Sequence, residues 1–152
     1  MHFQHILLTT DLSEASFEAF EIAAYQAKME NSEITLLHVL DNWEIPSVLY
    51  AHGITPSIIE SYKTDLLNEA KSRLESIAKE RFHGQAVNPQ VILGNKGSAL
   101  DICDYARGNS SDLIIIASHG RGSVAQLLLG STVEKIIRTA PCPVLVVPKQ
   151  KK

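Results

Sequence analysis

The sequence predicts an open α/β fold in which helices cover both faces of a parallel sheet. Apolar segments of strand length alternate with amphipathic segments of helix length along the 152 residues. This alternation is typical of parallel strands joined by crossover helices. Several strands, such as DLIII at 112–116, are continuously apolar, as strands buried on both faces are. No internal repeat or second core is evident, so we expect a single domain over residues 1–152.

The first third of the chain predicts a strand, a helix and a second strand. The run HILLTT (5–10) is short and apolar, which indicates a buried strand. Residues 11–30 follow with apolar side chains at helical spacing and acidic residues near the start, where the helix dipole favours them. The run EITLLHVL (33–40) predicts the second strand. The helical apolar positions are Phe17, Phe20, Ala24 and Ala27.

Residues 41–57 have no clear period and predict a long loop. We expect the apolar side chains in it, Trp43, Val48, Leu49 and Tyr50, to pack beneath the loop rather than to face a partner. A long amphipathic helix should begin at Pro56, with Thr55 as its cap, and end near Arg81. Its apolar stripe comprises Ile59, Tyr62, Leu66, Ala70, Leu74 and Ile77.

The remaining elements complete five strands. Residues 86–93 predict an edge strand because proline at position 89 cannot donate to a central ladder. Residues 112–118 predict a central strand, and 143–148 the last one. Two helices should lie between these strands. Their expected inward side chains are Ala99, Ile102, Cys103 and Ala106 in one helix and Val133, Ile136, Ile137 and Ala140 in the other.

Bulk properties exclude several functional classes. The net charge is −3 and the pI about 6.0, so the chain lacks the basic field typical of nucleic-acid binders, and the basic tail PKQKK is interpreted as a solvated end. The start is not that of a signal peptide, and no apolar run reaches the ~18 residues of a membrane span. A cytoplasmic protein is expected. Cys103 and Cys142 lack metal-ligand spacing and should be reduced thiols.

The glycine-rich stretch ASHGRGSVAQLLLGST (117–132) is the candidate binding site. Gly120 and Gly122 permit positive φ and close approach of a ligand, and their free N–H groups can form an anion nest. Arg121 adds positive charge. Gly130 and Ser131 open the next helix, whose N-terminal amides also favour an anion. If the first and fourth strands are the central pair, Asp11 in the loop TTDLSE lies across the crevice from this stretch.

Each of these side chains also has a purely structural interpretation. Ser131 begins the sequence STVE, a capping box, so it caps its helix, binds phosphate or does both. Asp11 is a candidate cap of the first helix. The structural interpretation of His119 is a loop histidine without a binding role, and that of Arg121 is a solvated surface charge. The spacing of the whole stretch favours an anion site over these separate interpretations.

The chain resembles the universal stress protein family over nearly its full length. ATP-binding members carry the pattern G-x2-G-x9-G-[ST] after the fourth strand, and here Gly120 is followed by nine residues and then Gly130 and Ser131. Ala117 stands at the first glycine of the pattern, where a backbone contact to ligand requires a negative φ. ILLTTDLSEAS, LLHVLD and APCPVLVVP are also family-like. The resemblance implies a Rossmann-like, adenine nucleotide alpha hydrolase-like sheet in the order 3-2-1-4-5.

The resemblance also implies ATP, or another adenine nucleotide, as ligand. Thr10 and Asp11 would lie by the adenosine, and Val39 would recognise the adenine edge through its backbone. Asp11 is in addition a candidate ligand of an accompanying Mg²⁺ ion. Members often form homodimers by antiparallel pairing of the last strand, here Pro143–Pro148. The residues expected along the ribose and phosphates are Ala117, His119, Gly120, Arg121, Gly122, Gly130, Ser131 and Thr132.

The expected function is that of a nucleotide-binding stress-response regulator rather than an enzyme, with slow ATP hydrolysis at most. No general base is evident near the glycine stretch, and the Lys-Ser/Thr of a Walker loop is missing. The alternative is a dimeric protein-interaction module without nucleotide, suggested by Ala117 and by the apolar loop. A phosphate-receiver domain is disfavoured because the chain lacks paired acidic residues at the end of the first strand and a lysine within the last strand, PVLVVP. A flavin protein is disfavoured because the loop after the first strand lacks a phosphate-binding run of Ser, Thr and Gly.

Overall fold

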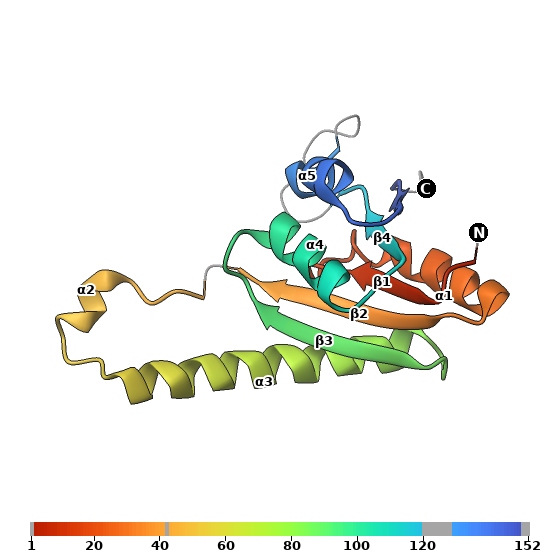
Figure 1. Cartoon of the computed structure of the whole chain (residues 1–152). Coiled ribbons are helices and arrows are strands. Elements are labelled where there is room, and N and C mark those ends of the chain that lie inside the picture. Colours follow the sequence, from red (N-terminus) through yellow and green to blue (C-terminus); the bar gives the residue numbers. More distant parts are fainter. Residues whose placement is uncertain (1, 42, 120–128, 150–152) are drawn as a thin grey trace.

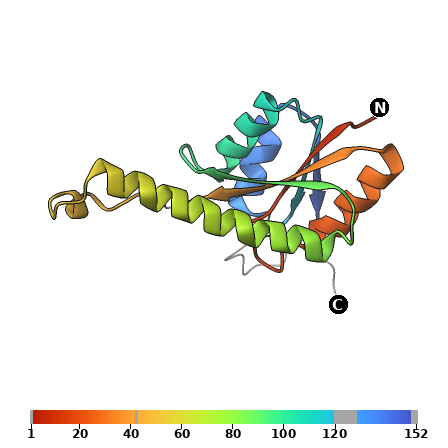
Figure 2. The same ribbon diagram turned by 90° about the horizontal axis from the view of Figure 1, so that it is seen from below.

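The computed structural model describes residues 2–41, 43–119 and 129–149, and it contains one five-stranded parallel sheet. The strand order is β3-β2-β1-β4-β5, as the family resemblance implied, and helices cover both faces (Figures 1 and 2). The predicted fold class is therefore confirmed. The strands are β1 (His5–Thr9), β2 (Glu33–Leu40), β3 (Val87–Leu93), β4 (Leu113–Ala117) and β5 (Val144–Val147); the helices are α1 (Glu18–Glu30), α2 (Ser47–Tyr50), α3 (Pro56–Arg81), α4 (Ser98–Gly108) and α5 (Ser131–Thr139).

The central strand β1 explains why its sequence lacks a polar alternation. Ile6 and Leu8 point into the apolar core beneath α1 and α3, whereas Leu7 points into the core beneath α4 and α5. All three side chains are almost completely buried. Both faces of the strand are therefore dry, and period-two patterning is replaced by a continuous apolar run.

α1 begins later than the sequence pattern indicated, and Asp11 does not cap it. The N-cap residue of α1 is Phe17, which makes no side-chain capping bond. Residues 11–17 form turns instead, with Ser16 N–H donating to Ser13 O over 3.0 Å. Leu12 has a φ of 64°, a left-handed conformation incompatible with a helix. The capping interpretation of Asp11 is therefore wrong.

α3 begins as predicted and then divides into two unlike halves. Thr55 Oγ1 accepts the Ile58 N–H, and Pro56 occupies the first turn. The second half of the helix packs on β3 and β2 through Ala70, Leu74 and Ala78, whereas the first half projects beyond the sheet together with α2 (Figure 1). We call residues 44–65 the arm.

The expectation that the loop packs its apolar side chains is wrong for three of the four. Val48 is 61% exposed, and Leu49 and Tyr50 are also exposed on α2. Trp43 alone is half-buried, because it lies at the root of the arm, where the chain leaves β2. The arm carries these side chains away from the sheet, so no core is available to them (Figure 1).

The other strands and helices agree with their predicted positions, and one predicted inward side chain does not. β3 is an edge strand, as Pro89 indicated, and β4 is central. In α5, Val133 and Ile136 are buried in the core beneath α4 and α5, whereas Ile137 is exposed. Both cysteines are free thiols. Among the described residues, no helix is long and apolar enough to span a membrane.

Candidate functional site

The candidate site lies at the carboxyl edge of the sheet, where β1 and β4 are neighbours. β1 leads toward α1 on one face, whereas β4 leads toward α5 on the other. The two connections therefore diverge, and such a switch point is where open α/β sheets bind ligands. The segment after β1, the segment after β4 and the first turn of α5 meet at this edge.

Thr10 is held in place by its own polar groups. Its Oγ1 accepts the Leu12 N–H over 3.0 Å and lies 2.7 Å from Ser16 Oγ. Its carbonyl oxygen accepts a hydrogen bond from His38 Nδ1 over 2.9 Å, which requires the proton to be on that nitrogen. The side chain is buried, so these bonds determine the path by which the chain leaves β1.

Asp11 follows at the edge and is only half-buried. Its Oδ1 accepts hydrogen bonds from the N–H and the hydroxyl of Ser13, over 3.0 and 2.5 Å. These bonds form a turn of the Asx type, which orients the carboxylate at the end of the central strand. The residue is therefore placed where the sequence analysis expected it, although not as a helix cap.

Val39 presents its backbone toward the gap beside β1. Thr10 N–H donates to Leu37 O over 3.0 Å, and Gly94 N–H donates to Leu40 O over 2.8 Å. Leu37 therefore faces β1 and Leu40 faces β3. Since successive residues of a strand face opposite neighbours, the N–H and C=O of Val39 face β1. Among the described residues, the Thr10 bond is the β1–β2 rung furthest along this edge, so the Val39 pair lies beyond the ladder.

The exit from β4 is joined directly to the start of α5. Ser118 N–H donates to Val147 O over 2.7 Å, and Ser118 O accepts the Gly130 N–H over 3.1 Å. His119 Nδ1 lies 2.7 Å from Ser118 Oγ. The two ends of the glycine-rich stretch are thus brought together. Gly120, Arg121 and Gly122, which were predicted to contact the ligand, lie outside the described residues.

Ala117 occupies the last position of β4 and is buried. It pairs with Val147 in the ladder and is not among the described residues with positive φ. Replacement of the first motif glycine by alanine therefore introduces no backbone strain at this position. The requirement for a negative φ, stated from the sequence, is met.

The N-terminus of α5 lacks a side-chain cap. Gly130 is the N-cap residue, with φ −62° and ψ 148°, and no side-chain capping bond is formed. The capping-box interpretation of Ser131 is therefore wrong, because Ser131 is the first helical residue rather than the cap. Ser131 is exposed, and Thr132 follows it. The first amides of the helix thus point to the carboxyl edge without a competing side-chain acceptor.

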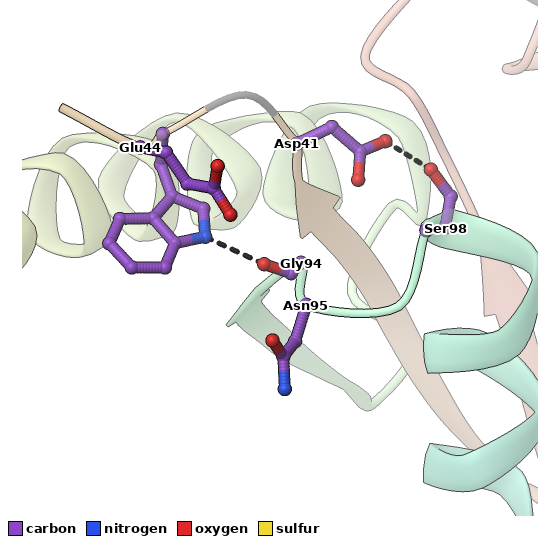
Figure 3. Close-up of a pocket in the computed structure, with 7 residues that line it drawn as sticks. Asp41, Glu44, Gly94, Asn95 and Ser98 are labelled. Carbon is purple, nitrogen blue, oxygen red and sulfur yellow. Dashed lines mark hydrogen bonds between the residues drawn. The ribbon is translucent and has the colours of Figure 1, made fainter. Parts of the chain in front are cut away.

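A second feature of the same edge was not predicted. A hollow of about 380 Å³ lies at the ends of β2 and β3 (Figure 3). Trp43 Nε1–H donates to Gly94 O over 2.7 Å, and Ser98 Oγ–H donates to Asp41. None of the residues predicted to bind nucleotide lines the hollow. Its lining residues are Asp41, Trp43, Glu44, Gly94, Asn95, Gly97 and Ser98.

The loop behind this hollow is tied by carboxylates of α4. Asp101 accepts hydrogen bonds from the N–H groups of Asn95 and Lys96, over 2.9 and 3.2 Å. The Lys96 ammonium donates to Asp104 over 2.7 Å, which raises the pKa of Lys96 and lowers the pKa of Asp104. The glycines on either side of Lys96 indicate a turn in the sequence. They do not indicate that carboxylates of α4 bind this turn.

The strand order defines a doubly wound α/β protein whose β1/β4 switch point is a candidate ligand edge. Comparison with known sequences assigns the family: the profile of the Universal stress protein family matches residues 2–148. The chain belongs to the universal stress protein family.

Individual relatives agree with this assignment. The chain is 32% identical over 158 residues to Universal stress protein MJ0577 of Methanocaldococcus jannaschii, covering 97% of this chain and 96% of that protein. It is 27% identical over 150 residues to Universal stress protein YxiE of Bacillus subtilis, covering 95% and 99%. A solved structure of MJ0577 superposes with a TM-score of 0.78 at 30% identity, with both chains fully covered.

Two more distant structures share the fold and contain nucleotides. One is a universal stress protein in complex with cAMP, with a TM-score of 0.62 at 20% identity, covering 99% of this chain and all of that one. The other is the universal stress protein from Archaeoglobus fulgidus in complex with dAMP, with a TM-score of 0.58 at 19% identity, covering 96% and 98%.

Proposed function

We propose that this chain binds an adenine nucleotide, with ATP as the first candidate, in the crevice at the carboxyl ends of β1 and β4. The observation that carries the proposal is the uncapped N-terminus of α5, which opens onto the switch point beside the exit of β4. Amides at a helix start favour phosphate through hydrogen bonds and through the dipole. Gly130, Ser131 and Thr132 would hold the phosphates there.

The base is expected at the opposite side of the crevice, beside β2. The N–H and C=O of Val39 form a donor–acceptor pair beyond the last β1 rung. Adenine offers an acceptor at N1 and a donor at its amino group, so the two edges are complementary. Thr10 and Asp11 follow β1, which lies between β2 and β4, so they would lie beside the ribose. The cAMP and dAMP complexes of fold relatives support an adenine nucleotide as the ligand class.

Mg²⁺ would be held mainly by the phosphates. No group of three His, Cys, Asp or Glu side chains with metal-ligating geometry occurs within the described segments. Mg²⁺ commonly binds through one or two carboxylates, substrate phosphates and water, so Asp11 suffices as the protein ligand. The role that we propose is regulatory, because the sequence has no Walker-type Lys-Ser/Thr and no evident general base beside the glycine-rich stretch.

The direct test is to denature the purified protein and to identify the released small molecules by mass spectrometry. A thermal shift on addition of Mg-ATP accompanies it. A ligand at 100 times its Kd stabilises by about 2.7 kcal/mol, which raises the Tm by several degrees. Release of adenine nucleotide near one per chain, or such a shift, supports the proposal. Absence of both contradicts it.

A matched pair of serine variants locates the phosphates. Ser131 and Ser47 each occupy the first position of a helix and are exposed, but Ser47 lies on the arm. We expect Ser131→Ala to weaken ATP binding about tenfold and Ser47→Ala to leave it unchanged, with the Tm of both unliganded variants near that of the parent. Titration calorimetry measures the difference. Equal affinities would place the phosphates elsewhere.

We also infer that two copies associate through β5. Among the described strands β5 pairs with β4 alone, and Leu145 on it is exposed. An unprotected apolar edge strand is a template for pairing with another strand. Leu145→Lys should convert a dimer into a monomer in light scattering. A parent protein that is monomeric at micromolar concentrations contradicts the inference.

A second candidate function is that of a protein-interaction module without nucleotide. The exposed apolar side chains of the arm favour it, because Val48, Leu49 and Tyr50 have no core to cover them. Under this alternative no nucleotide is released on denaturation, and substitution of the three side chains by serine abolishes partner binding. Tight, stoichiometric ATP retention decides against it.

A further inference from the structure

Two adjacent threonines at the end of β1 differ in their hydrogen bonding. Thr10 Oγ1 is bonded to the Leu12 N–H and to Ser16 Oγ. Thr9 is only 4% exposed, and its Oγ1 has no hydrogen-bond partner. Among the described residues, it is the one buried side-chain oxygen or nitrogen atom that has no hydrogen-bond partner. A hydroxyl removed from water without a replacement bond destabilises the folded chain.

Thr9 is the last residue of β1, so its hydroxyl lies near the switch point. Side chains two residues apart on a strand share a face, so Thr9 lies on the same side as Leu7. Leu7 packs with Val39 and Ile116 in the core beneath α4 and α5. The hydroxyl is therefore on the face that α5 covers, at the carboxyl end of β1. In register, Thr9 is paired with Leu37, two residues before Val39.

We propose that Thr9 Oγ1 hydrogen-bonds the nucleoside part of the bound nucleotide, which supplies the partner missing in the unliganded chain. The inference rests on the proposed nucleotide function and adds a binding residue to it. Thr9 pairs with Leu37, two residues before the Val39 backbone that would recognise the base, so we assign its contact to the base or the ribose. A hydroxyl both donates and accepts, and nucleosides offer both kinds of group.

The burial of the oxygen has a consequence for binding. Because the atom has almost no exposed surface in the unliganded chain, a nucleotide reaches it only when the groups that cover it move aside. Binding then exchanges an unsatisfied hydroxyl for a satisfied one. The same hydroxyl should therefore lower the stability of the free protein and raise its affinity for nucleotide, a combination that a purely structural threonine does not produce.

Thr9→Val tests this combination, since valine keeps the branched shape and removes the hydroxyl. We expect the Tm of the unliganded variant to rise by about 2–4 °C. Affinities for ATP, ADP and AMP should all fall about tenfold, and Thr9→Ser should restore most of the loss. Thr10→Val is the matched control for stability: it removes a bonded hydroxyl, so its Tm should fall. Calorimetry and thermal unfolding give both readouts.

Four results would overturn the inference. If Thr9→Val leaves the nucleotide affinities unchanged, the inference about Thr9 fails while the proposed function stands. A lower Tm of unliganded Thr9→Val means that the hydroxyl is already bonded in the free protein. A loss confined to ATP places the contact at the phosphates instead of the nucleoside. If the parent protein neither releases nor binds an adenine nucleotide, the proposed function fails, and this inference fails with it.

Discussion

The two halves of α3 share one apolar stripe at helical spacing and have different surroundings. In the second half, Leu74 is fully buried against β3 and β2. In the first half, Tyr62 occupies the same stripe, three turns earlier, and is 44% exposed. One helix therefore spans a region of dense core and a region with almost none. Local sequence determines that the helix continues, whereas the extent of the sheet determines how much of its apolar stripe is covered.

The root of the arm is held by a few specific contacts instead of a core. Trp43 donates to Gly94 O, and the Lys63 ammonium lies 4.8 Å from the centre of the Trp43 ring. A cation–π contact of this exposed kind contributes about 0.5–1 kcal/mol. The arm should therefore open locally at a lower free energy than the sheet. The predictions below test this difference between the halves.

The largest effect is expected at Leu74. Truncation of Leu74 to alanine leaves a cavity among residues of α1, α3 and the sheet, and should cost about 2–5 kcal/mol of unfolding free energy. Urea denaturation followed by circular dichroism measures it. A cost below about 1 kcal/mol would mean that the second half of α3 is no better packed than the first.

The stripe on α3 illustrates what periodicity predicts and what it cannot. Helical spacing from Ile59 to Ile77 correctly predicted one long helix, and Thr55 with Pro56 correctly predicted its start. Periodicity describes which side chains share a face, but it does not contain the position of the sheet edge. The packing predicted for Val48 and Tyr50 failed for the same reason, since their burial depends on where other elements end.

An intermediate effect is expected at Gly94, beside the root of the arm. A methyl group there would lie 2.6 Å from Asp41 Oδ1, 3.1 Å from Leu40 O and 3.3 Å from Val39 Cγ1. Because two of these contacts involve the end of β2, Gly94→Ala should cost about 1–3 kcal/mol. It should also weaken nucleotide binding, since it displaces Val39. Gly108→Ala, which meets nothing within 4 Å, is the control.

The site was predictable in its outline and not in its hydrogen bonds. The TTD and glycine-rich segments were correctly expected to follow the central strands, because strand order follows from apolar content and crossover rules. Which hydroxyl is bonded was not predictable: Thr10 and Thr9 are identical in type and adjacent. The STVE pattern predicted a cap at Ser131, but the helix begins one residue earlier than that requires, and Gly130 takes the cap position.

A smaller effect is expected at Thr55, the cap of the projecting half. Loss of an N-cap oxygen typically costs about 0.5–2 kcal/mol of helix stability. Since this half contributes little to the core, Thr55→Ala should accelerate amide exchange over residues 58–62 while leaving the urea midpoint nearly unchanged. Native-state hydrogen exchange measures the first and denaturation the second. A midpoint that falls as much as local protection would show that the arm and the sheet unfold together.

The smallest effect is expected from two exposed apolar side chains in the projecting half of α3. Replacement of Ile58 and Tyr62 by serine removes apolar surface that is already about half exposed, so the unfolding free energy should change by no more than about 0.5 kcal/mol. Serine has nearly the same helix propensity as isoleucine and tyrosine, so the change in propensity adds little to the free energy of unfolding. If the double variant instead loses stability that depends on protein concentration, the arm is packed against a second copy, and the contrast between the two halves of α3 holds for the monomer alone.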